Sequence, residues 1–190
     1  MFFEWADYCE KYEDEISSWM NDPDTCRFAT DSIKDEHEYY MGISDDYDSH
    51  NYKFNETYFC KVILEESEII GVIIIFRGDE YPVHINPLIV NPKQRSKGYG
   101  TKIISELISN ITDITGYDGN IFTADIFPDN KASIKAFEKA GFILAGIHIS
   151  GDCAYWVYPA AELENYRKYC IDSFEKSGNG GKFIFYTGGM

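Results

Sequence analysis

A short basic segment with two glycines holds the residue types and spacing from which chemistry is predicted most directly. Residues 95–100 are Arg-Ser-Lys-Gly-Tyr-Gly, and they stand between an apolar run, Leu88–Val90, and a stretch with apolar residues at helical spacing. A glycine turn that leads into a helix presents unpaired backbone N–H groups at the positive end of the helix dipole. Such a terminus binds phosphate. Because Arg95 and Lys97 add positive charge, the segment predicts a seat for a phosphorylated ligand.

A second segment, residues 130–142, has the pattern of a helix with marked ends. Asn130 predicts the start of the helix, and Gly141 is the expected left-handed stop. Asn130 follows Gly100 by thirty residues. The first segment lacks the Lys-Ser or Lys-Thr ending of a Walker loop and the first glycine of a dinucleotide-binding fingerprint. The first segment is therefore unlike both of these nucleotide-binding loops.

Together the two segments resemble the acetyl-coenzyme A site of the GNAT superfamily of N-acetyltransferases, and the resemblance extends over residues 10–158. It implies that backbone N–H groups of the glycine segment hold the pyrophosphate, with glycines that allow close approach. It also implies that the preceding strand pairs with the pantetheine arm of acetyl-coenzyme A, the co-substrate. The cofactor-binding residues implied are Leu88, Ile89, Val90, Arg95, Ser96, Lys97, Gly98, Tyr99, Gly100, Asn130 and Phe137. Asn130 either contacts the pantetheine or caps its helix, and the two roles are compatible.

The residue at position 137 departs from the family pattern. Acetyl transfer to an amine requires a neutral amine, a group or water chain that takes its proton, and an acid for the leaving thiolate. Many GNAT enzymes place a tyrosine acid where this chain has Phe137, and a phenyl ring cannot donate a proton. Tyr155, Tyr158 or solvent are the alternatives for this role.

Two further residues are candidates for binding or deprotonating the amine. The stretch Asp125–Asn130 resembles the D-x-x-P-x-N segment of some aminoglycoside 6′-N-acetyltransferases, whose aspartate faces the amine. The alternative is that Asp125 pairs with a lysine or caps a turn. His84 lies on a predicted strand and is a second candidate base. A lone histidine on a strand is more often packed or solvated.

The elements that position these residues alternate in character along the chain. Residues 69–76 are a continuous β-branched run, which predicts a central strand covered on both faces. Pro87 within the strand Val83–Val90 predicts a bulge and a broken hydrogen-bond ladder. The other predicted strands are Met1–Trp5, Thr57–Leu64, Asn120–Phe127, Phe142–Ile149, Cys153–Tyr158 and Lys182–Thr187. The predicted helices are Tyr12–Met20, Ser32–Met41, the stretch after Gly100, Asn130–Ala140 and Ala161–Lys176.

The resemblance and these elements predict one fold. We expect an α/β protein with the GNAT fold, in which a mixed, mostly antiparallel central sheet of six to seven strands is flanked by helices. Residues 1–159 are expected to form the GNAT N-acetyltransferase domain, and residues 160–190 a C-terminal helix and strand extension of the same domain. The segment 183–186 is expected to pair with a sheet edge, in cis or in a homodimer.

The composition and net charge limit the kinds of partner that we expect for this protein. The formal net charge is −15, from 32 acidic and 17 basic residues, which disfavours nucleic-acid binding. The acidity either favours a cationic acceptor or only keeps the protein soluble. No apolar run approaches the roughly 20 residues that span a bilayer, and the N-terminus lacks the pattern of a signal peptide. The five scattered cysteines indicate reduced thiols and a cytoplasmic protein. The loop 44–56 carries clustered carboxylates, but its spacing matches no calcium loop, so we predict no metal site.

Two functions follow from the sequence. The first is an acetyl-coenzyme A-dependent N-acetyltransferase that acts on a primary amine by direct transfer, because no cysteine stands where a nucleophile would be expected. Its acceptor is an aminoglycoside, a polyamine or a peptide N-terminus. The second is a coenzyme A-binding regulatory or interaction module that has lost catalysis, which the phenylalanine at position 137 suggests.

Overall fold

One mixed sheet organises the molecule. The computed structural model describes residues 2–29, 32–41, 56–78, 82–148, 150–176 and 183–184. The sheet has eight strands in the order β1-β2-β3-β4-β5-β7-β6-β8. The strands are β1 (Glu4–Asp7), β2 (Glu56–Glu65), β3 (Glu68–Gly78), β4 (Val83–Val90), β5 (Phe122–Ile126), β6 (Ile143–His148), β7 (Ala154–Tyr158) and β8 (Phe183–Ile184). Only the β4–β5 pair is parallel among these strands. This confirms the mixed, mostly antiparallel sheet, whose eighth strand belongs to the C-terminal extension.

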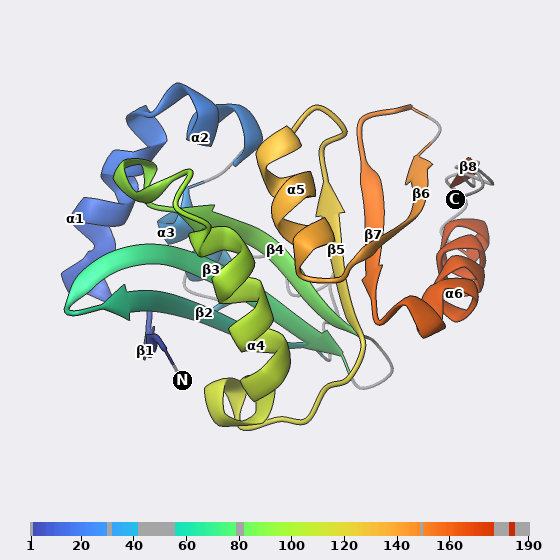
Figure 1. Ribbon diagram of the computed structural model, residues 1–190, viewed down its shortest axis with the longest axis horizontal. Helices are drawn as coiled ribbons and strands as arrows, with labels where there is room; N and C mark the ends of the chain where they lie inside the picture. Colours follow the sequence, from blue (N-terminus) through green and yellow to red (C-terminus); the bar gives the residue numbers. More distant parts are fainter. Residues whose placement is uncertain are drawn as a thin grey trace.

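Helices cover both faces of the sheet (Figure 1). The helices and 3₁₀ turns are α1 (Glu10–Ser18), η1 (Trp19–Asn21), α2 (Pro23–Phe28), α3 (Ile33–Tyr40), η2 (Pro92–Gln94), α4 (Tyr99–Thr115), α5 (Lys131–Lys139), η3 (Ala160–Glu162) and α6 (Leu163–Lys176). Buried residues of α4 and α5 form one core with one face of the sheet. On the opposite face, α1, η1 and α3 cover β2 and β3, and α6 covers β6 and β7. None of the helices within the described residues is long and apolar enough to cross a membrane.

The central strand β3 buries side chains on both faces of the sheet, so helices must cover both faces. Val72 and Ile74 point into the core beneath α1 and α3, while Ile73 and Ile75 point into the core beneath α4. All four side chains are at most 1% exposed. The continuous β-branched run therefore forms a strand covered on both faces, as its pattern predicts.

The N-terminal third differs in detail from the expectation. The single helix predicted over Tyr12–Met20 is α1 followed by the turn η1, and a further short helix, α2, begins after Asp22. The Asp22 carboxylate accepts a hydrogen bond from the Thr25 backbone N–H at 2.9 Å and caps α2. A six-residue helix is too short to show a hydrophobic period, so the sequence pattern missed it. The expected cap at Ser32 is present, since its hydroxyl accepts from the Asp35 N–H at 3.1 Å.

The ends of the chain agree with the prediction where they are described. The N-terminal strand is an edge strand, shifted to Glu4–Asp7, and it pairs with β2. At the other end, Phe183 and Ile184 pair in cis with His148 and Ile147 of β6. The remainder of the strand predicted over residues 182–187 and the acidic loop at 44–55 lie outside the described residues. All five cysteines are described, and none forms a disulfide.

Candidate active site

Strands β4 and β5 are paired at one end only, so the sheet opens between them. The parallel pairing joins Val83, His84 and Ile85 to residues 122–124 and goes no further among the described residues, although β4 continues to Val90. Figure 1 shows the two strands diverging from their shared end. Backbone N–H and C=O groups of β4 beyond Ile85 are thus not paired with β5. They are available to an extended ligand that lies along β4 as a strand would.

The proline bulge lies at the start of this divergence. Two residues of β4, Asn86 and Pro87, stand opposite the single residue Ile74 of β3. The pairing resumes at Leu88 with Ile73. The expected break in the ladder at Pro87 is confirmed, and the bulge bends β4 away from β5.

The glycine segment leads into α4 as the sequence predicts. Gly98 is the N-cap residue with φ 84°, and no side chain caps the helix among the described residues. The first helical bond runs from the Lys102 N–H to the Gly98 carbonyl at 3.1 Å. The N–H groups of the first turn are therefore without intrahelical acceptors and lie at the positive end of the dipole. Ser96 also has a positive φ, 64°, so the loop is tightly turned before the helix begins.

The long side chains of this loop are held by other protein groups. Arg95 donates to the Asp22 carboxylate at 2.6 Å and to the Thr25 hydroxyl, and its guanidinium lies 3.7 Å from Asp24. Lys97 donates to the Gln94 side-chain oxygen at 2.5 Å. Two carboxylates thus compensate the charge of Arg95. The backbone of the loop, more than the arginine, is positioned for an anion.

The two glycines serve different geometric needs. At Gly98 the positive φ disfavours any side chain, although a Cβ there would meet no atom within 4 Å. At Gly100 a Cβ would lie 3.3 Å from the Ala136 Cβ of α5. Gly100 therefore lets the start of α4 approach α5 closely.

The α5 residues expected to contact the donor have defined places. Asn130 caps α5, because its side-chain oxygen accepts from the Ser133 N–H at 3.1 Å. Within the described part of the chain its Nδ2 group donates no hydrogen bond, so the cap leaves a donor for a ligand. Phe137 is 5% exposed and stands edge-on to Phe142 at 4.9 Å between centroids. The ring packs in the core beneath α5.

The three candidate catalytic residues lie on one face of three adjacent strands. His84 of β4 is opposite Thr123 of β5, and Asp125 of β5 is opposite Tyr155 of β7. Directly opposed residues, and residues two apart on one strand, share a face. Asp125 directly follows Ala124, the last β5 residue paired with β4, so its carboxylate stands where the strands part. The structure therefore brings His84, Asp125 and Tyr155 together.

Tyr158 does not belong to this group. It is at the far end of β7, opposite Phe122. Its ring lies on the other face of the sheet, 5.7 Å from the Phe142 ring. Of the two tyrosines proposed to replace the missing acid, Tyr155 alone shares a face with Asp125.

The Asp125 carboxylate is in an unusual environment. Its Oδ1 atom is buried without a hydrogen-bond partner, and no described lysine pairs with the group. Burial raises the pKa of Asp125, and the nearby His84 lowers it. Burial also raises the pKa of Tyr155, with contributions from Cys153 and Asp125, so the phenol keeps its proton at neutral pH. The site thus holds a carboxyl group that favours gaining a proton beside a hydroxyl that retains one.

Two residues of this face were not among the sequence candidates. Thr123 is 2% exposed, and its hydroxyl lies 3.0 Å from Nδ1 of His84. Tyr166 of α6 is 8% exposed and lies in the small core against which Tyr155 packs. The helical period of residues 161–176 marks Tyr166 as buried, but no sequence signal places α6 against β6 and β7.

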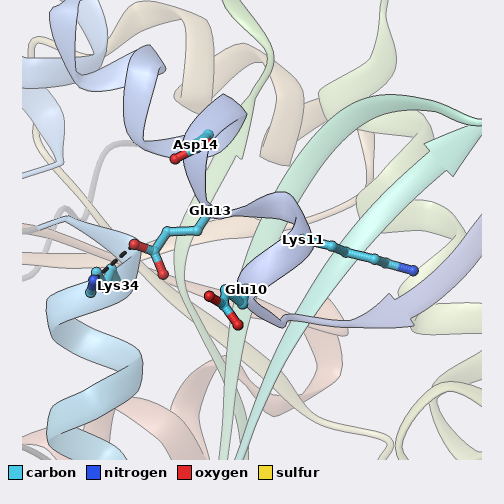
Figure 2. Close-up of a pocket in the computed structure, with 5 residues that line it drawn as sticks. All are labelled: Glu10, Lys11, Glu13, Asp14 and Lys34. Atoms are coloured by element: carbon cyan, nitrogen blue, oxygen red, sulfur yellow. Dashed lines mark hydrogen bonds and ion pairs between the residues drawn. The ribbon is translucent and has the colours of Figure 1, made fainter.

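A separate surface depression carries no comparable chemistry. Figure 2 shows its lining, which comes from Glu10, Lys11, Glu13 and Asp14 of α1 and Lys34 of α3. Lys34 pairs with Glu13 at 2.8 Å. None of the residues that form the site on β4, β5 and β7 lines this depression.

A mixed sheet that parts beside an uncapped helix N-terminus, with a half-buried carboxylate where it parts, can seat a phosphorylated ligand along β4 next to a carboxylate. Comparison with known proteins agrees. The model of the acetyltransferase (GNAT) family matches residues 8–142, and the chain belongs to this family.

The similarity to one individual protein covers a shorter part of the chain than the family match does. The chain is 39% identical over 74 residues to the uncharacterized N-acetyltransferase YfmK of Bacillus subtilis (strain 168), a match that covers 39% of this chain and 47% of that protein. The chain therefore matches about half the length of this relative.

Solved structures share the fold. Aminoglycoside acetyltransferase AAC(6′)-Ib in complex with coenzyme A is 20% identical with a TM-score of 0.61, covering 87% of this chain and 99% of that one. Spermidine N-acetyltransferase from Vibrio cholerae in complex with coenzyme A and spermine is 12% identical with a TM-score of 0.63, covering 85% and 98%.

Proposed function

We propose that this protein transfers an acetyl group from acetyl-coenzyme A to a primary amine by direct transfer, and that the amine is cationic in solution. The observation that carries the proposal is the Asp125 carboxylate, which is half-buried where β4 and β5 part and whose Oδ1 atom is buried without a hydrogen-bond partner. A carboxylate without a partner is costly in a folded protein and is retained most readily where a ligand supplies the partner. An amine that enters along this face supplies it.

In this proposal, acetyl-coenzyme A is bound mainly by backbone groups of the chain. The uncapped first turn of α4 and the loop formed by residues 95–100 offer N–H groups to the pyrophosphate. Leu88, Ile89 and Val90 offer strand hydrogen bonds to the pantetheine, and Nδ2 of Asn130 offers a side-chain donor. When bound, acetyl-coenzyme A supplies an acetyl group activated as a thioester. A backbone N–H near the Pro87 bulge is our candidate to polarise its carbonyl.

The proposed site for the amine acceptor is formed by Asp125, His84 and Tyr155. A primary amine has a pKa near 10, so it must lose a proton before it can attack. Asp125 binds the ammonium group and takes this proton, directly or through water, because its burial favours the protonated carboxyl. Tyr155 is the proton donor for the leaving thiolate, a role that Phe137 cannot fill.

Several features favour a cationic acceptor. The chain carries a net charge of −15, which attracts cations. A line of aromatic rings leads from α3 towards the site: Tyr40 stacks on Tyr58 at 5.1 Å, and Phe76 lies 4.8 Å from Tyr40 and 6.4 Å from His84. Aromatic faces attract ammonium groups. The similar folds named above were solved with spermine and, for AAC(6′)-Ib, also with kanamycin.

We also propose that the protein works in the cytoplasm, where acetyl-coenzyme A is available and its five unpaired cysteines stay reduced. The second candidate function, a coenzyme A-binding module without catalysis, rests on Phe137 alone. The convergence of His84, Asp125 and Tyr155 on one face favours the enzyme.

Thiol release from acetyl-coenzyme A tests the proposal. The purified protein is incubated with acetyl-coenzyme A and, in separate reactions, spermine, kanamycin and a peptide with a free N-terminus, while calorimetry measures coenzyme A binding. The proposal expects amine-dependent thiol release with at least one acceptor and little without an amine. Tight coenzyme binding with no turnover on any amine would instead support the binding module.

A further inference from the structure

The short helix α2 bridges the wide end of the opening between β4 and β5. The two parallel strands pair only at their amino-terminal ends, so the opening widens towards their carboxyl ends. Residues 95–98 lie in the connection from β4 to α4, and residues 127–129 connect β5 to α5. Side chains of α2 and of its cap contact both connections, and Figure 1 shows α2 beside the start of α5. A ligand that lies along β4 with its phosphates at residues 95–100 therefore has α2 at its phosphate end.

The contact of α2 with the glycine loop is the stronger of its two contacts. Arg95 donates to the carboxylate of Asp22, the cap of α2, at 2.6 Å, and also donates to the Thr25 hydroxyl. The side chains of Arg95 and Asp22 are 31% and 29% exposed, and Thr25 is buried. Partly buried, charge-assisted hydrogen bonds that share one guanidinium form a network and resist exchange with water. We therefore expect α2 to stay attached to the glycine loop.

The contact of α2 with the connection after β5 is weaker. Arg27 pairs with Asp129, and these two side chains are 62% and 57% exposed. The rings of Phe28 and Phe127 lie 6.1 Å apart, and Phe127 is 39% exposed. An isolated, exposed ion pair contributes little to stability, because water and salt screen it. This contact can therefore break while the contact with Arg95 persists.

Apolar burial does not hold α2 in place. None of its residues, Pro23–Phe28, belongs to a hydrophobic core within the part of the chain that the structure describes. Segments with few buried apolar contacts open at a low cost in free energy. Trp19 before the helix and Ala29 after it are buried in the core beneath α1 and α3. The chain is thus fixed on either side of α2, and the motion is confined to the short helix between these residues.

We propose that α2 is a strap over the donor site, which turns about its contact with Arg95 and opens at the Arg27–Asp129 ion pair to admit and release coenzyme A. When closed, the strap also holds the connection that joins Asp125 to Asn130, the residues assigned to the acceptor and the donor. The inference rests on the proposed seat of the donor along β4. It does not depend on which amine is acetylated.

Stopped-flow measurement of coenzyme A binding tests the strap. Arg27→Gln and Asp129→Asn each break the same ion pair and should each raise the fraction of open molecules. We expect the association and dissociation rate constants to rise together by about two- to fivefold in both variants. The dissociation constant should stay within about twofold of wild type, because a strap controls entry and exit alike.

The two substitutions also separate the strap from a simple effect of charge. They change the local charge in opposite directions, so attraction of the anionic coenzyme alone would slow association in Arg27→Gln and speed it in Asp129→Asn. The exchanged pair, Arg27→Asp with Asp129→Arg, restores the ion pair and should return both rate constants towards wild type. Lys34→Gln is the matched control, because it breaks the exposed Lys34–Glu13 pair between α3 and α1, and it should change neither rate constant.

Three results would overturn the inference: unchanged rate constants in both variants, changes of opposite sign, or faster dissociation without faster association. The measurement uses coenzyme A alone. These results are therefore distinct from an absence of turnover on every amine, which would contradict the proposed function and leave the strap in place.

Discussion

The proposed function depends most on one residue, Asp125, a half-buried carboxylate with one oxygen that has no protein partner. Asp125 stands where β4 and β5 part, and its Oδ1 atom is buried without a hydrogen bond. Such a group is retained at a cost in stability. Removing the charge of Asp125 should therefore lower the activity and raise the stability of the protein.

Asp125→Asn is expected to raise the melting temperature at neutral pH. Burial raises the pKa of Asp125 in the folded state, so the carboxyl favours folding when protonated, and this contribution is lost as pH rises through the folded pKa. Asparagine cannot ionise, so the gain over wild type should increase from pH 5 to pH 8. Thermal unfolding at several pH values measures it. The exposed Asp113→Asn is the control, and a gain that does not grow with pH would contradict the account.

At the residue scale, the sequence selected candidates that the fold brings to one face, but it could not assemble them. Asp125, His84 and Tyr155 were selected by type and by resemblance, each from a separate segment. Their convergence depends on strand register, and a shift of one residue would turn a side chain to the other face. The same limit explains why Tyr158 remained an alternative and why Thr123 was overlooked.

The two ends of α4 offer a controlled test of the phosphate seat at the scale of one element. Gly98 before the helix and Gly116 after it have φ values of 84° and 79°, and a Cβ at either would meet no atom within 4 Å. Alanine at each position should cost about 1–2 kcal/mol of unfolding free energy, because both adopt left-handed backbone. Only Gly98→Ala should weaken coenzyme A binding, by about tenfold or more.

Denaturant unfolding and calorimetry measure these two effects. Equal loss of coenzyme A affinity in Gly98→Ala and Gly116→Ala would show that general strain in α4, and not the loop at its start, controls binding.

The short helix α2 links the two sides of the parted strands. Its cap, Asp22, pairs with Arg95 of the glycine loop, and its last turn pairs Arg27 with Asp129 before α5. No hydrophobic period could predict this element, since its role lies in polar contacts at its ends. By contrast, the apolar spacing in α4 and the β-branched run of β3 were sufficient to predict those elements.

Asp22→Asn tests whether Arg95 is held away from the donor. Asparagine caps a helix as well as aspartate does, so stability should change little. The guanidinium loses one of its compensating charges, and coenzyme A binding should tighten by about two- to fivefold at low salt, with the gain declining as salt rises. Calorimetry at two salt concentrations measures this. Asp14→Asn removes one exposed charge elsewhere and is the control. Weaker binding in Asp22→Asn would indicate that the ion pair shapes the loop.

At the scale of the whole molecule, Glu106 ties the N-terminal segment to the central helix. Its carboxylate accepts hydrogen bonds from the Phe2 N–H at 2.8 Å, the Phe3 N–H at 3.1 Å and the Trp5 indole at 3.0 Å. Burial opposes ionisation of Glu106, but these hydrogen bonds outweigh it and lower its pKa. The edge strand β1 is thereby attached to α4 as well as to β2.

Glu106→Gln is expected to reduce the unfolding free energy by about 1.5–3 kcal/mol at pH 7, the range for hydrogen bonds to a charged group. Because the folded pKa is lowered, the stabilisation is present above the unfolded pKa of the carboxyl and is lost as pH falls through the folded pKa. The difference between wild type and variant should therefore shrink in acid. Denaturant unfolding from pH 7 to pH 3 measures it, with the exposed Glu138→Gln as control. A difference independent of pH would contradict the role of the charge.

The overall architecture was accessible from the sequence because local patterns and the family resemblance agreed. The alternation of helices and strands, the bulge at Pro87 and the pairing of the C-terminal segment with a sheet edge were all predicted correctly. What could not be predicted is the packing of α6 in one small core with Tyr155, because it joins segments that no local pattern relates. The grouping of the candidate site residues is a property of the assembled molecule.

The kinetics of Asp125→Asn test the central claim most directly. We predict that kcat/KM for the best amine falls by about 10²–10⁴, the range for loss of a general base, while the coenzyme A dissociation constant stays within about twofold of wild type. An unchanged kcat/KM, or a loss matched by an equal loss of coenzyme A affinity, would contradict the claim that Asp125 receives the amine.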